Sequence, residues 1–365
     1  MRTSVSDFSR SLLHEWRRWS LPVKEGAVMI GVSGGADSVA LLLAADQLQR
    51  AGYIGTDIVA AHLDHGLRVE SANDAAWVIS LSKSLGRVVV SDRIDVGVLA
   101  DSTRDNVEQA ARRARYSFFE HAALSIGASH VLTGHTLDDQ AETVLMRLIR
   151  GSGVDGLAGM PVLRSLQKNS TVLLARPLLN WARRDKTEEF CSRLGYSFLR
   201  DSMNDDEAYS RVKVRKRIFP LLKELNPKYA ENISRAALLC REDSSSLSEQ
   251  ASKLLEAAKD EGFSATRSDE DRPNNGRGNS ALRVSVLVNA PQGLRRRALR
   301  LWLSQVKGDL RRIDSIHILA VERLLRPGRG GRIAELPGGG TVETRKGRLI
   351  FKKPPESSKM PAKAE

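Results

Sequence analysis

The sequence predicts an α/β protein, in which a doubly wound parallel sheet is followed by a helical segment and a small α+β C-terminal domain. Two observations predict this order. Short apolar runs typical of buried strands alternate with helical patterns in the first part of the chain. From residue 227 the pattern is helical, then polar and aperiodic over residues 264–280, then mixed. We therefore expect domains at residues 1–226, 227–280 and 281–353, with a disordered tail at 354–365.

The first strand and helix of this sheet enclose a loop of small residues. Residues 27–30 predict a buried strand and residues 39–43 predict the apolar start of a helix. Glycines allow a tight turn and the close approach of an anion, and the helix directs its positive end at the same place. We expect Ser38 to be the N-cap of that helix. A phosphate-like anion is thus predicted to bind the loop, which is Ser33-Gly34-Gly35-Ala36-Asp37-Ser38.

The residue types in this loop limit its phosphate chemistry. A Walker A loop needs a lysine that reaches the terminal phosphates, and this loop has none. The acidic Asp37 instead fits a ligand for the Mg²⁺ that accompanies nucleotide phosphates. The alternative is an ordinary strand-to-helix turn rich in glycine and serine.

The following segments continue the alternation of strands and helices. Strands are expected at residues 57–66, 87–90, 129–133 and 171–177, with helices at 72–85, 107–126, 137–150 and 184–194. Ligands of such sheets bind beyond the carboxyl ends of the strands. The polar segments 33–38, 62–66 and 134–139 are therefore expected to lie together at one edge.

A second glycine-rich segment matches the dinucleotide-binding pattern GxGxxG. It follows a predicted helix, so the strand–turn–helix context that the pattern needs is missing. A helix terminator and a loop are expected here instead, at Gly151-Ser152-Gly153-Val154-Asp155-Gly156.

The C-terminal part combines a long helix with a small mixed domain. A helix is expected at residues 228–258, a flexible linker at 264–280 and a strand at 284–288. A helix with a basic stripe follows, then a helix at 314–325 and strands at 332–336 and 341–344. The stripe consists of Arg295, Arg296, Arg297 and Arg300.

Composition narrows the class of protein. The net charge of +13 suggests an acidic partner, most simply a nucleic acid, although it could serve solubility alone. The two cysteines, Cys191 and Cys240, form no CxxC pair, which argues against a disulfide framework, a zinc site or an iron–sulfur cluster. Because no apolar run approaches membrane-spanning length, we expect a soluble cytoplasmic protein without a membrane partner.

Candidate catalytic groups follow the strand at 129–133. His135 lies on the strand-end loop, and Asp139 and Glu142 share one face of the next helix. Three alternatives remain open, namely a metal-binding triad, acids that cap the helix, and a carboxylate pair for a cationic substrate. On the preceding helix Glu108 and Arg112 have the i,i+4 spacing of a surface ion pair.

The basic run after residue 209 has two interpretations. It contains Arg211 and Arg215 and precedes a short apolar helix. Such a run is usually a solvated face, but next to a phosphate loop it is about as well explained by phosphate contact.

At the loop 33–38 the chain resembles the N-type ATP pyrophosphatases, whose PP-loop has the pattern SGGxDS. Longer motifs resemble one family of them, the tRNA(Ile)-lysidine synthases. The matching segments are residues 62–67 (HxxHGLR type), 106–116 (NLExxARxxRY), 134–143 (GHxxDDQxET), 150–160 (RGSGxxGLxxM), 176–179 and 201–205. The resemblance covers about residues 26–226, and the tail matches loosely. Val212 stands where many members have asparagine, so no role of that asparagine is carried over.

The resemblance implies a PP-loop fold and a reaction with ATP and Mg²⁺. ATP adenylates the C2 oxygen of the wobble cytidine of tRNA(Ile) with the CAU anticodon, and pyrophosphate leaves. The ε-amine of free L-lysine then displaces AMP, which gives lysidine and switches codon reading from AUG to AUA. Two rivals remain, another PP-loop tRNA-modifying enzyme of the 2-thiocytidine synthetase type and a non-catalytic RNA-binding protein. The oligomeric state is open, with a homodimer as one alternative.

The same resemblance implies the following residue roles. Catalysis is expected from Asp37, Asp139, Glu142, Arg112 and His135. ATP and pyrophosphate are expected to bind Ser33, Gly34, Gly35, Ala36, Asp37, Ser38 and His62, with Asp37 as the Mg²⁺ ligand. Lysine is expected to bind Asp139, Glu142, Arg112 and Arg115, and tRNA to bind Arg211, Arg215, Arg295, Arg296, Arg297 and Arg300.

Overall fold

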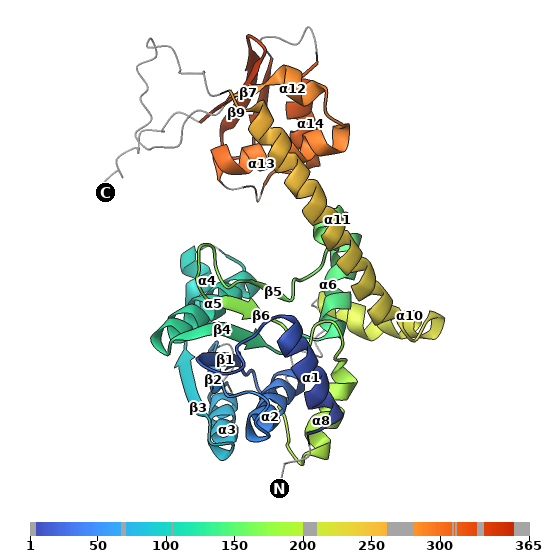
Figure 1. Cartoon of the computed structure of the whole chain (residues 1–365). Coiled ribbons are helices and arrows are strands. Elements are labelled where there is room, and N and C mark those ends of the chain that lie inside the picture. The colour runs from blue at the N-terminus through green and yellow to red at the C-terminus, as the bar shows by residue number, and fades with distance from the viewer. Residues whose placement is uncertain are drawn as a thin grey trace, which may run out of the picture. The chain divides into compact units, whose positions relative to one another are not determined.

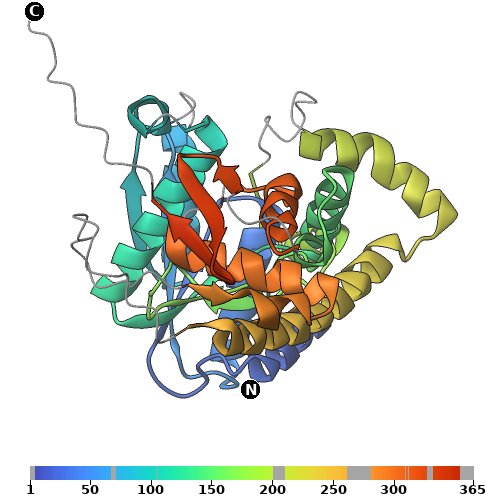
Figure 2. The ribbon, with the colours of Figure 1, turned by 90° about the horizontal axis from the view of Figure 1, so that it is seen from above.

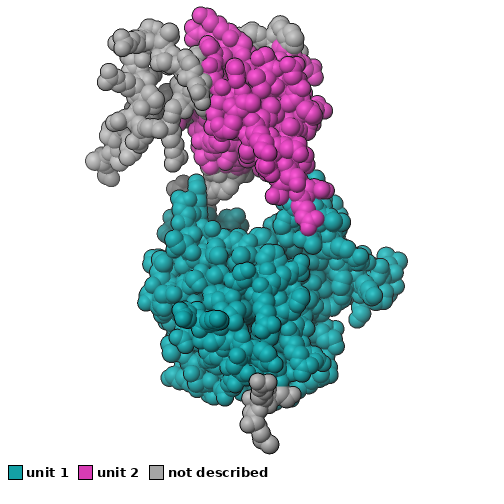
Figure 3. Space-filling view, viewed as in Figure 1, with its two compact units in different colours: residues 1–241 teal, residues 242–365 magenta. Residues whose placement is uncertain are grey.

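The chain forms two compact units in the computed structural model, residues 1–241 and 242–365 (Figure 3). The structure describes residues 5–66, 71–103, 105–199, 210–260, 281–308, 310, 312–326 and 332–353. The division falls within one long helix, α11 (Tyr229–Ala258). The segment 201–205, the linker expected at 264–280 and the tail expected at 354–365 lie outside the described residues.

The first unit is built on a six-stranded sheet, in the order β3-β2-β1-β4-β6-β5 (Figure 1). All pairings are parallel except that of the edge strand β5 with β6. The prediction of a doubly wound parallel sheet is therefore confirmed. The strands are β1 (Ala27–Gly31), β2 (Asp57–Asp64), β3 (Val88–Arg93), β4 (Ala128–Thr133), β5 (Leu163–Ser165) and β6 (Leu173–Ala175).

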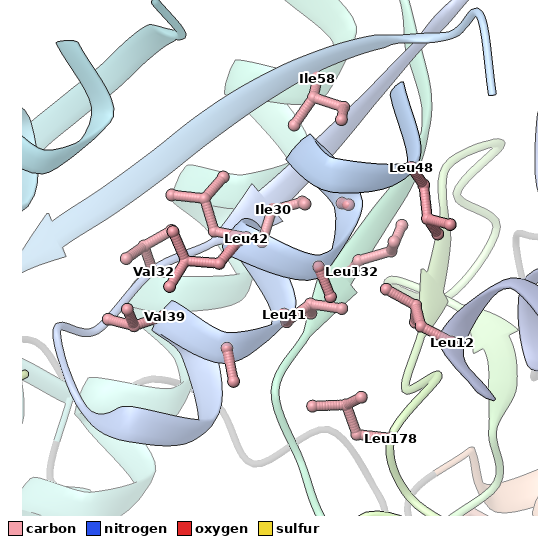
Figure 4. Close-up of a cluster of buried hydrophobic side chains, with 14 of the residues drawn as sticks. Leu12, Ile30, Val32, Val39, Leu41, Leu42, Leu48, Ile58, Leu132 and Leu178 are labelled. Carbon is pink, nitrogen blue, oxygen red and sulfur yellow. The ribbon is translucent and has the colours of Figure 1, made fainter. Parts of the chain in front are cut away.

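Helices cover both faces of this sheet because its strands are apolar on both sides. In β1, Val28 and Ile30 join the core on one face and Met29 joins the core on the other. The first face packs against α1, α2, α3 and α8, and a part of this core is shown in Figure 4. The second face packs against α5, through Phe118 and Phe119 among others. These helices are α1 (Asp7–Arg18), α2 (Ala36–Arg50), α3 (Ser71–Ser84), α5 (Val107–Ser125) and α8 (Arg184–Arg193).

The first unit contains further helices besides these and α11. They are α4 (Val96–Thr103), α6 (Leu137–Ile149), α7 (Val154–Leu157), α9 (Ser210–Lys213), the π-helical turn η2 (Val214–Ile218) and α10 (Phe219–Leu225). A separate apolar cluster joins α6 to η2, α10 and the start of α11 through Leu137, Val214, Phe219 and Tyr229. The expected helical segment is thus present, although the sequence patterns did not predict α4, α7 or the strand β5.

The second unit is a small α+β domain with an antiparallel sheet in the order β7-β10-β9-β8. Helices α13 and α14 pack on each other, and α14 contacts β8 (Figure 2). Its core is centred on the fully buried Trp302. The elements are β7 (Leu282–Arg283), α12 (Val284–Val288), α13 (Gln292–Lys307), α14 (Ser315–Arg323), β8 (Ile333–Leu336), β9 (Gly340–Arg345) and β10 (Arg348–Lys352).

The strand expected at residues 284–288 is wrong, because this segment is the helix α12. A run of five apolar or small residues has no period that separates a strand from one helical turn. In the helix only Leu287 is buried, and Val288 is exposed. The sheet contact is made by the two preceding residues, Leu282 and Arg283, which pair with β10.

Candidate functional site

The loop between β1 and α2 is held in an open turn by its own serines. The Ser38 hydroxyl accepts from the backbone N–H of Ser33 at 3.1 Å and donates to the carbonyl of Gly35 at 2.9 Å. The two serine hydroxyl oxygens are 3.2 Å apart. The N-cap is Gly35, so the expectation that Ser38 caps α2 is wrong. Because Gly35 has no capping side chain, the first N–H groups of α2 are left for an anion.

Two glycines allow the segments around the loop to approach closely. Gly34 has a φ of +92°, and a Cβ there would lie 2.5 Å from a methyl group of Leu199. Gly134 follows β4, and a Cβ there would lie 2.7 Å from the backbone of Asp37. Any side chain at either position would push the loop away from its neighbours. The strand ends of β1 and β4 are thus in contact, as their expected position at one edge requires.

The three carboxylates predicted for catalysis converge on one guanidinium group, that of Arg184 at the start of α8. Arg184 donates to Asp139 at 3.0 Å and to Asp37 at 3.4 Å, and its Nη1 lies 3.7 Å from Glu142. Its side chain is about a quarter exposed, and that of Glu142 is buried. The structure therefore joins the phosphate loop and the acidic helix α6 into one site.

Sequence reasoning missed Arg184 and its neighbour Thr187, which also donates to the Asp37 carboxylate. Both lie on α8, which follows β6 by a short segment. A third contact fixes the start of this helix, because the backbone N–H of Arg184 donates to Asp138 at 2.8 Å. The available signal was their place just beyond another strand of the same sheet.

Burial and the guanidinium of Arg184 shift the pKa values of the three acids in different directions. Burial raises the pKa of Asp37 to about 6, against the attraction of Arg184. Burial also raises the pKa of Glu142, although Arg215 and Arg184 oppose it. At Asp139 the effect of burial is outweighed by Arg184, His135 and the N–H and hydroxyl of Thr136, so its pKa is lowered. Of the two acids on α6, Asp139 thus favours its charged form, and Glu142 is the better proton acceptor.

Asp139 and Glu142 also differ in what else they do. The Asp139 carboxylate accepts from the backbone N–H of Thr136 at 2.8 Å and completes a capping box at the start of α6. Glu142 lies a turn further on and takes no part in capping. It accepts from Arg215 at 2.8 Å, and Arg215 belongs to the π-helical turn η2. The capping alternative therefore holds for Asp139 and fails for Glu142.

The other predicted residues lie around this centre. His62, at the end of β2, is buried with its Nδ1 2.8 Å from the carbonyl of Val32. Arg115 lies on α5 with its guanidinium 3.1 Å from the ring of His65. Arg211 is exposed on α9, and Val212 beside it is buried. The i,i+4 pair expected at Glu108 is not formed within the described residues, since the Arg112 guanidinium lies over the ring of Tyr116 instead.

His135 is held neutral beside the acids. Its Nδ1 lies 2.9 Å from the hydroxyl of Thr133. Its pKa is lowered to about 4, because burial disfavours the imidazolium and the charges of Arg176, Arg115 and Arg112 oppose the attraction of Asp139. In this structure His135 therefore lacks the proton that a general acid needs at neutral pH.

This lowered pKa predicts a loss of stability in acid. The unfolded chain takes up a proton at the ring below pH 6.5, and the folded chain does so only at about pH 4. The contribution of the neutral His135 ring to the free energy of unfolding is thus complete above pH 6.5 and is lost as the pH falls toward 4. His135→Gln should remove a decline on the order of 1–3 kcal/mol in the free energy of unfolding. Denaturant unfolding at neutral pH and at about pH 5 would measure this decline. The exposed His121→Gln is the control and should keep the wild-type decline. If the free energy of unfolding declines equally in both variants, the prediction is wrong.

The glycine-rich segment after α6 is a loop that leads into the short helix α7 (Val154–Leu157), and it lacks the strand–turn–helix context of a dinucleotide site. It follows a helix, as expected, and its carbonyls at Gly156 and Gly159 accept from Arg147 at 2.9 Å each. Gln140 holds Met160 by two hydrogen bonds, of 3.0 and 2.8 Å. Because the segment follows a helix and its carbonyls accept from Arg147, the GxGxxG match is explained by local structure alone.

Neither cysteine belongs to a cluster of possible metal ligands among the described residues. Cys191 is buried on α8 with its sulfur 3.6 Å from the carbonyl of Ala36, and burial raises the pKa of its thiol to about 12. Cys240 is a free thiol on α11. No group of three or more His, Cys, Asp or Glu side chains in the described part of the chain is arranged to hold a metal ion by protein ligands alone. Among the described residues no helix is long and apolar enough to cross a membrane.

In the second unit, the predicted basic stripe is partly engaged within the domain. Arg295 and Arg296 both pair with Glu322, at 2.9 and 2.7 Å. Arg297 donates to the carbonyl of Ser244 at 2.6 Å, and Arg300 is exposed. A pocket of about 270 Å³ adjoins the Glu322 pairs and is lined by Arg295, Arg296, Arg323 and Arg326 among others. Arg297 thus supports the fold of the domain, whereas the pocket presents several arginines at its lining.

Comparisons with known proteins agree on both units. A PP-loop domain model matches residues 6–222, and a TilS substrate binding domain model matches residues 282–350. The tRNA(Ile)-lysidine synthase of Salinispora tropica is 37% identical over 326 residues, which are 89% of this chain and 90% of that protein. The synthase of Leifsonia xyli subsp. xyli is 39% identical and covers 87% of each chain. That of Thermus thermophilus is 35% identical over 90% of this chain but only 57% of its own length.

Among solved structures, the U34-tRNA thiolase NcsA from Methanococcus maripaludis is similar, with a TM-score of 0.52. The match covers 63% of this chain and 76% of that chain, at 17% sequence identity. At this identity the likeness shows a shared fold alone.

Proposed function

Because the chain belongs to the tRNA(Ile)-lysidine synthase family, we propose that it joins free lysine to C2 of the wobble cytidine in tRNA(Ile) with the CAU anticodon, using ATP. The observation that carries this proposal is the convergence of Asp37, Asp139 and Glu142 on Arg184. It joins a phosphate loop to an acidic site that suits a cationic amine. An enzyme that transfers lysine after adenylation needs both at one place.

In the first step the C2 oxygen of cytidine attacks the α-phosphorus of ATP, and the bond to the β-phosphate breaks. The N–H groups at the start of α2 and the hydroxyl of Ser33 bind the leaving pyrophosphate. The Asp37 carboxylate would hold Mg²⁺ together with the phosphates of ATP, in a site of the kind that uses one carboxylate and substrate oxygens, and the bound ion would supply neutralisation of phosphate charge.

In the second step the ε-nitrogen of lysine attacks C2, and the bond from C2 to the oxygen that carries AMP breaks. Asp139 and Glu142 recognise the cationic side chain, because their carboxylates can accept charge-assisted hydrogen bonds from an ammonium group beside the guanidinium of Arg184. Glu142 accepts the proton that the attacking amine must lose, since its raised pKa makes it the stronger base. Arg184 keeps both acids in place before lysine arrives.

The second unit contributes to tRNA binding through phosphate contacts. Its pocket is lined by Arg295, Arg296 and Arg323, with no aromatic side chain among the described lining residues, and Arg300 is exposed, which favours backbone over base recognition. Arg211, on α9, and Arg215, on η2, are the corresponding candidates in the first unit, although Arg215 is already bonded to Glu142.

Removing charge from the second unit should weaken tRNA binding alone. The double variant Arg296→Gln, Arg300→Gln should raise the KM for tRNA and lower the salt slope of binding by about one unit for each lost contact. The KM for lysine should stay unchanged. A double variant at the exposed Arg10 and Arg193 of the first unit removes the same charge and serves as control. If both double variants have the wild-type salt slope, the pocket and Arg300 are a solvated surface.

Labelled lysine tests the proposed function. The full chain, ATP and Mg²⁺ should transfer label to tRNA(Ile) with CAU, and one AMP and one pyrophosphate should form for each lysine transferred. The same tRNA with uridine at the wobble position is the control and should take up none. Release of ADP and orthophosphate, or label on neither tRNA, would contradict the proposal. Transfer of sulfur instead of lysine would favour the 2-thiocytidine type, which the absence of cysteine pairs in the sequence argues against.

A further inference from the structure

Next to the acidic site, a group of arginines surrounds the ring of Tyr116 on α5. The guanidinium carbon of Arg112 lies 4.9 Å from the ring centroid, and that of Arg164, on β5, lies 5.1 Å from it. Arg176, after β6, is the third member, and its charge acts on both Tyr116 and His135. Two arginines from separate elements thus lie over one aromatic ring, and the charge of a third acts on its hydroxyl.

These arginines have no acidic partner in the part of the chain that the structure describes. Arg164 donates to the carbonyls of Ser165 and Leu166, at 2.7 and 2.8 Å. Arg176 donates to the carbonyl of Pro161 at 2.8 Å. Among the described residues their charges therefore face carbonyls and an aromatic ring, in contrast to Arg113 on the same helix α5, which pairs with Asp105 at 2.6 Å.

Arg176 is the arginine of this group whose burial is least favourable. Its side chain is buried, with 2% of the residue exposed, and its Nε has no hydrogen-bond partner among the described residues. A buried guanidinium with an unused donor is unfavourable unless an anion approaches it. The shared positive field is strong enough that Arg112, Arg176 and Arg164 outweigh burial and lower the pKa of the Tyr116 hydroxyl.

The arginines of this group and the acids of α6 act on the same histidine. His135 feels the negative charge of Asp139 and the positive charges of Arg176, Arg115 and Arg112 at once. Groups of both charges thus lie close enough to act on one histidine, so a substrate with a cationic and an anionic group would find a partner for each nearby. Lysine has such a pair of groups in its ε-ammonium and α-carboxylate, and the adenylated tRNA has phosphates beside the reacting base.

We propose that Arg164 and Arg112, whose guanidinium groups lie over the ring of Tyr116, form with the nearby buried Arg176 an oxyanion site that binds a carboxylate or phosphate of the substrates. The inference rests on the proposed function and adds Arg164, Arg176 and Tyr116 to the residues expected to bind lysine or nucleotide. Guanidinium groups suit either oxyanion, since both accept paired N–H donors. Arg112 is exposed and Arg164 is half-buried, so their unused N–H groups provide the donors, and the buried Arg176 adds a fixed charge nearby.

The test uses the full chain with Arg164→Gln, Arg164→Lys and the control Arg113→Gln. Arg164→Gln should raise the KM of one substrate by about tenfold or more, because one charge-assisted hydrogen bond is lost. Arg164→Lys should recover part of that loss, and Arg113→Gln should match the wild type. Far-UV circular dichroism and thermal unfolding confirm that each variant is folded.

Cadaverine, which is lysine without the carboxyl group, distinguishes the two sources of the oxyanion. If the site binds the lysine carboxylate, Arg164→Gln should weaken lysine and leave cadaverine unchanged. If it binds a phosphate, the KM for ATP or tRNA should rise while both amines are used as by the wild type. If the KM values of all three substrates equal those of Arg113→Gln, the oxyanion site is wrong. Wild-type protein that forms no lysidine would instead overturn the proposed function.

Discussion

Glu142→Gln should separate adenylation of the tRNA from lysine transfer. The kcat/KM for lysine should fall by about 10²-fold or more, because the variant loses both a charge that recognises the ammonium group and the proton acceptor. ATP and tRNA should bind as before, since the phosphate loop is untouched. Glutamine still accepts the hydrogen bond of Arg215, and burial already disfavours the charged form of Glu142, so the fold should tolerate the change.

The surface variant Glu189→Gln is the matched control for Glu142→Gln. Glu189 lies on α8 and pairs with Lys186 and Arg193 at the surface, away from the three acids. It should have wild-type kinetics. Asp139→Asn is a weaker test, because it also removes a helix cap worth about 1 kcal/mol. If Glu142→Gln transfers lysine at the wild-type rate, the lysine site lies elsewhere.

Asp37→Asn should abolish the first step instead. AMP formation should fall by about 10³-fold or more, because the change removes the carboxylate proposed to bind Mg²⁺ beside the leaving pyrophosphate. Lysine should still bind the α6 acids, which a binding measurement without ATP can check. The exposed Asp185→Asn, in the first turn of α8, is the control. AMP formation at the wild-type rate would remove Asp37 from the reaction.

Stability distinguishes this loss of function from a loss of fold. Burial raises the pKa of Asp37 to about 6, so the folded chain holds a proton there between pH 3.8 and 6 that the unfolded chain has lost. The charged carboxylate therefore lowers stability as the pH rises through that window. Asp37→Asn should be at least as stable as the wild type at neutral pH. A large drop in Tm would mean that the contacts with Thr187 and Arg184 dominate.

Local sequence patterns predicted part of this site, whereas the residues contributed by distant parts of the chain could not be predicted. Strand-end position and residue type predicted the phosphate loop, His62, Asp139 and Glu142, because these follow from local patterns at one sheet edge. Arg184 lies 147 residues after Asp37, and Thr187 lies 150 residues after it. Only the folded sheet brings them together. The same holds for Arg164 and Arg176, whose arrangement around Tyr116 depends on the antiparallel pairing of β5 with β6.

The errors have local physical causes. Gly35 caps α2 because the chain enters the helix one turn earlier than the apolar pattern indicates, which moves Ser38 inside it. The segment 284–288 became a helix because five apolar or small residues satisfy either structure. The stripe Arg295 to Arg300 looked uniform in sequence, yet Glu322, far along the chain, neutralises part of it.

Single-turnover quench with ATP labelled at the α-phosphate tests the central claim most directly. Enzyme, tRNA(Ile) with CAU and ATP are mixed without lysine, and the tRNA is isolated. We expect label on the tRNA as bound AMP, and a chase with lysine should release it as free AMP while lysidine forms at the same rate. Label that never becomes bound to the tRNA, together with lysidine formed at the normal rate, would contradict an adenylated tRNA intermediate and the two-step account of this site.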